Sequence, residues 1–112
     1  MTLPAGEVVP GLLVSVEHEP VANEQRVAGT ATSGFVALGE FGDTEVGIWE
    51  MTPGTATDVE VDEVFIVLSG RARVEFSDRP AIEVGAGDIV RLEAGMATTW
   101  TVAETLRKVY LA

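Results

Sequence analysis

Apolar residues recur at every second position through most of this chain, and this period of two constrains its fold more than any other feature. Between positions 71 and 76, charged residues alternate with Ala72, Val74 and Phe76, which predicts a strand with one face in the core and one in water. The run Val64–Leu68 is apolar on both faces, as in a central strand. Similar short runs rich in strand-forming residues lie at 12–16, 46–49, 89–92, 99–102 and 109–111. We therefore predict an all-β fold.

Turn signals separate these runs at short intervals. They are Gly42-Asp43, Thr52-Pro53-Gly54, Ser69-Gly70, Ser77–Pro80 and Gly85–Asp88. Many short strands with frequent turns indicate a sandwich or a barrel. The polar segment Ala22–Gly34 lacks clear alternation and is either a long loop or an edge strand, and Ala103–Leu106 is the one candidate for a helical turn.

Size and charge narrow the class of protein. A chain of 112 residues is one domain, and the absence of cysteine excludes disulfides and thiolate zinc sites. The net charge of −11 repels phosphate backbones and anionic lipids, so we expect neither nucleic acid nor membrane partners. No apolar stretch is long enough to span a membrane. Met1–Pro4 shows no basic region followed by an apolar run, so we expect no signal peptide and a cytoplasmic location.

An ordered set of short motifs fills the second half of the chain. The motifs are Gly47-Ile48-Trp49-Glu50, Pro53-Gly54, Asp62-Glu63-Val64, Val67–Gly70, Gly85–Asp88, Ala94-Gly95, Thr99–Val102 and Arg107–Tyr110. On these motifs the chain resembles the cupin superfamily, and most of all its small branch that includes the cupin domains of ureidoglycine aminohydrolase. The resemblance implies a double-stranded β-helix, or jelly-roll barrel, that often forms a homodimer. We expect a single cupin domain over 1–112, with N-terminal strands and a loop over 1–33 and the barrel over 34–112.

The resemblance also marks where metal ligands would lie. Metal-binding cupins usually carry two histidines, a glutamate and a third histidine, and the matching positions here hold Ala56, Asp58, Glu63 and Thr98. A catalytic transition metal needs about three good protein ligands. We therefore expect no transition metal and no other cofactor. A hard ion such as Mg²⁺ or Ca²⁺ on Asp58 and Glu63, with waters, stays open as an alternative.

Residues two apart on a strand face the same side, which yields a candidate pocket. If Glu63 points inward, so does Phe65, and Thr98 similarly brings Trp100 with it. The family's pattern places further residues near the same cavity, although the period does not decide whether Lys108 and Tyr110 or their neighbours face inward. The candidate ligand-binding residues are Trp49, Met51, Asp58, Phe65, Thr98, Trp100, Lys108 and Tyr110, with Glu63 as the candidate catalytic residue.

Each candidate also has a structural explanation. The aromatic residues could simply form the core, and the acidic run from Asp58 to Glu63 could be a solvated loop. An inward carboxylate in an apolar barrel is costly unless it is paired, protonated or used. Glu63 is therefore either functional or paired, for example with Lys108 or a backbone amide. We expect the single histidine, His18, at a surface strand end.

The leading functional hypothesis is a metal-free cupin that binds a small polar organic molecule. Glu63 would be its polar anchor, aromatic side chains its walls, and Lys108 a contact for an anionic group. Whether the protein is an enzyme stays open; if it is, Glu63 would act as general acid or base. One alternative is a non-catalytic dimeric module, sensory or structural, whose own side chains fill the barrel. The other, which the resemblance suggests, is an enzyme of ureide or amine metabolism related to ureidoglycine aminohydrolase.

Overall fold

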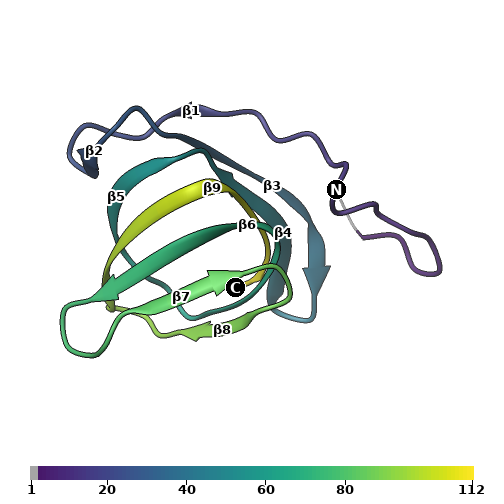
Figure 1. The fold of residues 1–112 in the computed structure, drawn as a ribbon. Helices are drawn as coiled ribbons and strands as arrows, with labels where there is room; N and C mark the ends of the chain where they lie inside the picture. The colour runs from purple at the N-terminus through teal and green to yellow at the C-terminus, as the bar shows by residue number, and fades with distance from the viewer. Residues whose placement is uncertain (1–2) are drawn as a thin grey trace.

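The computed structural model describes residues 3–112 and folds this part of the chain into nine strands without a helix (Figure 1). The strands are β1 (Glu19–Pro20), β2 (Arg26–Ala28), β3 (Thr32–Phe41), β4 (Thr44–Met51), β5 (Gly54–Val59), β6 (Glu63–Phe76), β7 (Ile82–Gly85), β8 (Ile89–Leu92) and β9 (Ala97–Leu111). Residues 3–112 thus contain no helix that could cross a membrane. Met1 and Thr2, on which the expected lack of a signal peptide partly depends, lie outside the described residues.

Two long strands, β6 and β9, hold the sheet together. One edge of β9 pairs antiparallel with β4 through its second half and with β5 through its first half, and its other edge pairs with β6. The far edge of β6 pairs with β8 and then with β7. Each long strand thus pairs along one edge with two shorter strands, one after the other, and the sheet curls around an interior, as Figure 1 shows. The predicted all-β barrel is confirmed.

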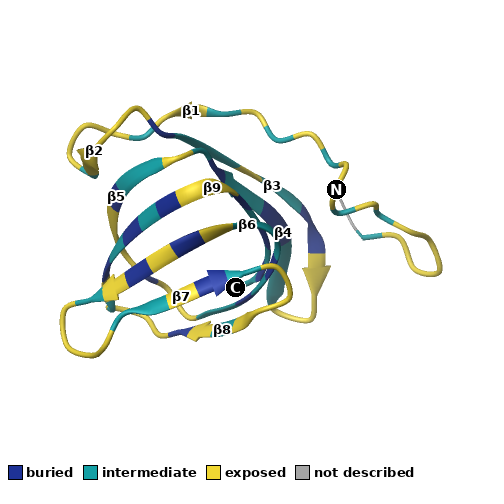
Figure 2. Cartoon of the chain, viewed as in Figure 1, coloured by how far each residue is buried: buried dark blue, intermediate teal, exposed yellow. Residues whose placement is uncertain are grey.

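Burial alternates along both long strands, as the predicted period of two requires. On β9 every buried residue lies at an even position, from Thr98 to Tyr110, and the bands of Figure 2 follow this alternation. Lys108 and Tyr110 therefore face the interior, whereas Val109 and Leu111 are only half-buried. This decides a point that the sequence left open.

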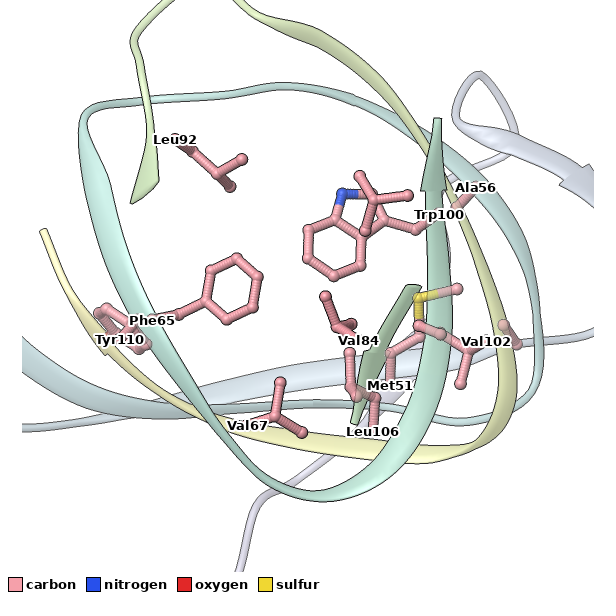
Figure 3. Close-up of a cluster of buried hydrophobic side chains, with 13 residues drawn as sticks. Met51, Ala56, Phe65, Val67, Val84, Leu92, Trp100, Val102, Leu106 and Tyr110 are labelled. Atoms are coloured by element: carbon pink, nitrogen blue, oxygen red, sulfur yellow. The ribbon is translucent and has the colours of Figure 1, made fainter. Parts of the chain in front are cut away.

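The core gathers around Phe65 and Trp100, whose ring centroids lie 5.6 Å apart. Figure 3 shows both rings pointing into the barrel, with Leu92 beside them and Val67 below. Phe65 and Leu92 are completely buried. Burying a side chain of this size contributes about 1.5–3 kcal/mol. The core thus fixes the strands that carry the candidate site.

Gly70 interrupts β6 without ending it. The sequence predicted a turn at Ser69-Gly70, and this prediction is wrong, because both residues lie within β6 where its register with β9 shifts. Gly70 has a φ of +89°, and a Cβ there would collide with the carbonyl of Thr105. The glycine therefore permits a bulge that bends a continuous strand. The turns predicted at 42–43, 52–54, 77–80 and 85–88 do join successive strands.

The N-terminal segment differs most from expectation. Residues 11–13 form a turn and 14–18 have no strand partner, so the strand predicted at 12–16 is wrong. Two backbone carbonyls of this N-terminal segment bond to a side chain instead: Nη1 of Arg107 donates to the carbonyl oxygens of Gly11 and Val14, at 2.8 and 2.7 Å. The polar segment 22–34 contains a turn, β2 and the start of β3, and the helical candidate at 103–106 lies within β9.

Candidate functional site

A cavity of about 570 Å³ opens into the barrel between β3, β4, β5, β9 and the start of β6. Seven of the nine candidate residues line it: Trp49, Met51, Asp58, Glu63, Trp100, Lys108 and Tyr110. The other two candidate residues do not line the cavity but are buried next to it. Phe65 is fully buried beneath the wall, and Thr98 is buried with its hydroxyl directed at Glu60. The alternation of β9 and the cross-strand pair of Trp49 with Lys108 bring these distant residues together.

Lys108 and Glu63 form a buried ion pair inside the barrel. Nζ of Lys108 donates to Oε2 of Glu63 at 2.6 Å, and only 6% and 10% of the two side chains are exposed. The same Nζ lies 4.3 Å from the ring centre of Phe65, and 4.9 and 5.0 Å from those of Trp49 and Trp100. A carboxylate and three aromatic faces thus compensate the buried ammonium. Of the two roles left open for Glu63, pairing with Lys108 is the one that these contacts form.

Glu60 belongs to the site, although the sequence reasoning missed it. It lies between β5 and β6, is 7% exposed, and lines the cavity. Its Oε2 accepts hydrogen bonds from the Thr98 hydroxyl at 2.6 Å and from the Trp100 indole at 3.1 Å. Its backbone N–H and C=O are both bonded to the turn at 95–96. The sequence did hold a signal for this acceptor: residues 98 and 100 were expected to point inward, and their hydroxyl and indole N–H donors need an acceptor when they are buried.

Asp58 lies at the mouth of the cavity, two residues from Glu60. Its Oδ1 accepts a hydrogen bond of 2.8 Å from the backbone N–H of Val59. Partial burial raises the pKa of Asp58 above 3.8, and the negative charges of Glu60 and then Glu63 act in the same direction. The backbone bond and the charge of Lys108 oppose this rise in pKa. Two acidic side chains therefore share one small volume at some electrostatic cost.

Comparison with known proteins identifies the family. Residues 38–110 match the family model of the EutQ-like cupin domain. The chain is a member of this cupin family. A search of the curated proteins found no match.

Solved structures share the fold. A protein of unknown function from Rhizobium leguminosarum is 26% identical over 70% of this chain and 78% of that one, with a TM-score of 0.64. A protein of unknown function from Pseudomonas syringae is 20% identical over 88% of this chain, with a TM-score of 0.76, but the match spans 44% of that longer chain. The EutQ protein of Clostridium difficile is 16% identical over 93% of this chain and 83% of that one, with a TM-score of 0.69. These likenesses support a jelly-roll cupin barrel, whereas the narrower resemblance to ureidoglycine aminohydrolase stays a prediction.

The donor set of this cupin does not fit the transition metal that the wider fold family often holds. Three of the four positions matched to metal ligands are unsuitable. The Ala56 side chain has no ligand atom, the Thr98 hydroxyl donates to Glu60, and the Glu63 carboxylate is bonded to Lys108. Within residues 3–112, no three His, Cys, Asp or Glu side chains are arranged to hold a metal ion. The ammonium of Lys108 also places a positive charge beside the one retained ligand position, which disfavours a second cation there.

Tyr110 closes the cavity of this cupin near the start of β4. Its hydroxyl donates to Oε2 of Glu45 at 2.7 Å. Burial, followed by this hydrogen bond and the charge of Glu45, raises the pKa of the Tyr110 hydroxyl well above its ordinary value of 10.0. Gly47, opposite Tyr110 on β4, leaves room for the ring, because a Cβ at Gly47 would collide with it. Tyr110 is thus a neutral hydrogen-bonding wall at neutral pH.

His18 lies outside the cavity of this cupin, on the outer face of the barrel. It directly precedes β1, and its side chain is 18% exposed because polar groups of the barrel surround it. Its Nε2 lies 2.7 Å from Oε1 of Glu50 and its Nδ1 lies 2.9 Å from the Thr32 hydroxyl. Arg107 donates to the other oxygen of Glu50 at 2.8 Å. These contacts fasten the N-terminal segment to the barrel.

Proposed function

We propose that this cupin binds a small polar organic molecule in its barrel cavity and does so without a transition metal. The observation that carries the proposal is the cavity itself: its volume of about 570 Å³ is lined by aromatic walls and by buried charged groups. Small-molecule sites are typically concave, mostly apolar clefts of about 300–1,000 Å³ with a few convergent polar groups. A barrel filled by its own side chains would leave no such space.

The polar anchor of the proposed site is Glu60 rather than Glu63. Both residues line the cavity, but Oε2 of Glu63 is bonded to Lys108 and its charge is neutralised there. Glu60 is held in place by two neutral donors, which leave its negative charge uncompensated by a cation. Because the Glu63 carboxylate is already bonded to the Lys108 ammonium, we propose binding and not a reaction.

Cavity-filling variants test this proposal. Purified protein is mixed with the small-molecule extract of the organism that makes it, and the unfolding temperature is measured, because a ligand that binds only the folded state raises it. Ala56 lines the cavity and is 8% exposed, so Ala56→Phe fills the space. Ala86 lies in an exposed turn, and Ala86→Phe is the matched control.

We expect the extract to stabilise the unchanged protein and Ala86→Phe, but not Ala56→Phe. Equal stabilisation of all three proteins would place binding outside the barrel. If the extract stabilises none of them while a stoichiometric metal is found by elemental analysis, the metal-free proposal is wrong.

A second candidate, a homodimeric module, is favoured by apolar side chains outside the cavity. Leu12 and Leu13 on the N-terminal segment are 62% and 79% exposed, and Phe41 at the end of β3 is 81% exposed. Exposed apolar groups of this kind are typical of interfaces between subunits. Light scattering after size exclusion tests it: twice the mass of 11.8 kDa supports the dimer, and the single mass contradicts it. Ureide or amine metabolism as the setting is a proposal that rests on the family resemblance alone.

A further inference from the structure

The charges that face the cavity do not balance. Within residues 3–112, four carboxylates line it together with one ammonium, that of Lys108; the carboxylates are those of Glu45, Asp58, Glu60 and Glu63. Glu63 and Lys108 neutralise each other at 2.6 Å. The Glu45 carboxylate accepts a hydrogen bond from the Tyr110 hydroxyl and adds a further negative charge. Within residues 3–112, no cation forms an ion pair with Glu45, Asp58 or Glu60, so the cavity is negative.

Glu60 lines this cavity, and only one of its two side-chain oxygens is hydrogen-bonded within residues 3–112. Both of its side-chain hydrogen bonds end on Oε2, and Oε1 accepts none from residues 3–112. At 7% exposure, an ionised group in this position is costly unless another charge or donor meets it. The neighbouring Asp58 has Oδ1 bonded to the Val59 amide and Oδ2 without a bond within the same part of the chain. Two acidic side chains that line one cavity thus each have an oxygen that accepts no hydrogen bond from residues 3–112.

We propose that the ligand of this cavity is a small organic cation, such as an alkylammonium or amidinium, whose N–H groups donate to Glu60 and Asp58. This inference rests on the proposed function and names the chemical class of its ligand. N–H donors carrying positive charge make the strong, short hydrogen bonds that free carboxylate oxygens favour. A bound cation also removes the repulsion between the two acids. Trp49 and Trp100 line the same cavity and offer apolar surface to the carbon atoms of such a ligand.

The rim of the cavity favours an organic cation over a bare metal ion. Phe35, Val59 and Val61 line the opening and are 65%, 68% and 57% exposed. Such side chains gain from contact with the carbon chain of an amine, whereas Mg²⁺ or Ca²⁺ needs six or more oxygen ligands. An anion is disfavoured because Lys108, the only cavity-facing cation within residues 3–112, is enclosed by Glu63 and three aromatic rings.

A titration with four probes tests the ligand class. The probes are n-butylammonium, the neutral n-butyramide, the anionic butyrate and Ca²⁺, each added at constant ionic strength so that screening does not differ. Binding is followed by the fluorescence of the two tryptophans, both of which line the cavity. We expect saturable binding of n-butylammonium, and binding at least tenfold weaker for the other three probes. Methylammonium should bind more weakly than n-butylammonium, by up to about fourfold for each methylene that the rim buries.

Variants locate the contact. Glu60→Gln keeps an oxygen for Thr98 and Trp100 but removes the charge, so it should weaken n-butylammonium binding at least tenfold while the fold persists. Asp58→Asn, at the exposed mouth, is the second variant and should also weaken binding even if Glu60→Gln unfolds. Glu104→Gln makes the same charge change at an exposed position on β9 that does not line the cavity, and should leave binding unchanged.

The outcomes separate this inference from the proposed function. Saturable binding of n-butyramide or butyrate, with none of n-butylammonium, overturns the cation and leaves a small-molecule site. Tighter binding of Ca²⁺ than of n-butylammonium would show that the cavity prefers a metal ion, and it overturns the proposal of an organic cation. No binding of any probe, or n-butylammonium binding that is unaffected by Glu60→Gln and Asp58→Asn, also overturns the inference. In those cases the extract experiment with Ala56→Phe decides independently whether the cavity binds anything.

Discussion

The buried pair of Lys108 and Glu63 makes a quantitative prediction about stability. Removing one partner leaves the other charge inside the barrel, where only 6% and 10% of the two side chains are exposed. Breaking a buried ion pair in this way costs roughly 3–5 kcal/mol of unfolding free energy, whereas replacing both partners by apolar residues is often neutral or stabilising. We therefore expect Lys108→Met and Glu63→Leu each to lose about 3–5 kcal/mol, and the double variant to lie within about 1.5 kcal/mol of the unchanged protein.

The measurement is a double-mutant cycle by urea unfolding, followed by tryptophan fluorescence. The two single losses and the small double loss imply a coupling of about 4.5 kcal/mol or more. The exposed pair of Arg73 and Glu83 is the matched control. It has a similar distance of 3.0 Å, but its side chains are 51% and 69% exposed. Its coupling should be about 0–1 kcal/mol. Additive effects of Lys108→Met and Glu63→Leu, within about 0.5 kcal/mol, would refute the buried pair.

Three further predictions concern other contacts. Gly47→Ala should cost about 1–3 kcal/mol, because its methyl group would displace the Tyr110 ring; calorimetry showing an unchanged unfolding temperature would be contrary. Arg107→Met should release the segment 11–18, since its guanidinium holds two carbonyls there, so limited proteolysis should cut this segment faster while the barrel persists; an unchanged cutting rate contradicts the anchor. Asp58→Asn should stabilise the protein at pH 7. Because the pKa of Asp58 is raised in the folded state, the ionised carboxylate costs stability above that pKa, and this cost disappears below about pH 3.8. The stability gained by Asp58→Asn should therefore disappear in acid, and a gain that does not change with pH would contradict the raised pKa.

The sequence was informative where alternation and spacing act locally. The period of two placed Phe65, Trp100 and their strands correctly, because each pleated strand sends successive side chains to opposite faces. The spacing of the cupin motifs singled out Glu63, and the structure shows this residue bonded to Lys108. The period of two could not decide which face of 108–111 points inward, because each face offers a large side chain that a core could bury: Tyr110 beside Lys108 on one face, Val109 and Leu111 on the other. Only the pairing of β9 with β4 and β6 decides it.

The failures have a common physical cause, because each depends on a partner distant in sequence. Residues 12–16 alternate like a strand, yet Arg107, more than 90 positions away, donates to the carbonyls of Gly11 and Val14 and holds this segment outside the sheet. Glu60 looks like part of a solvated acidic run, yet Thr98 and Trp100 bury it. Local patterns do not carry such information, because a buried polar group is stabilised by whatever the fold brings to it.

The central claim is that the barrel cavity of this cupin holds a small organic cation and no transition metal. The most direct measurement is native mass spectrometry, with elemental analysis, of protein purified from the organism that makes it. We predict one retained organic molecule per subunit, carrying a protonated nitrogen, which is lost in Ala56→Phe and in Glu60→Gln but kept in Glu104→Gln. Protein at its bare sequence mass, a retained anion, or a stoichiometric transition metal would contradict the account.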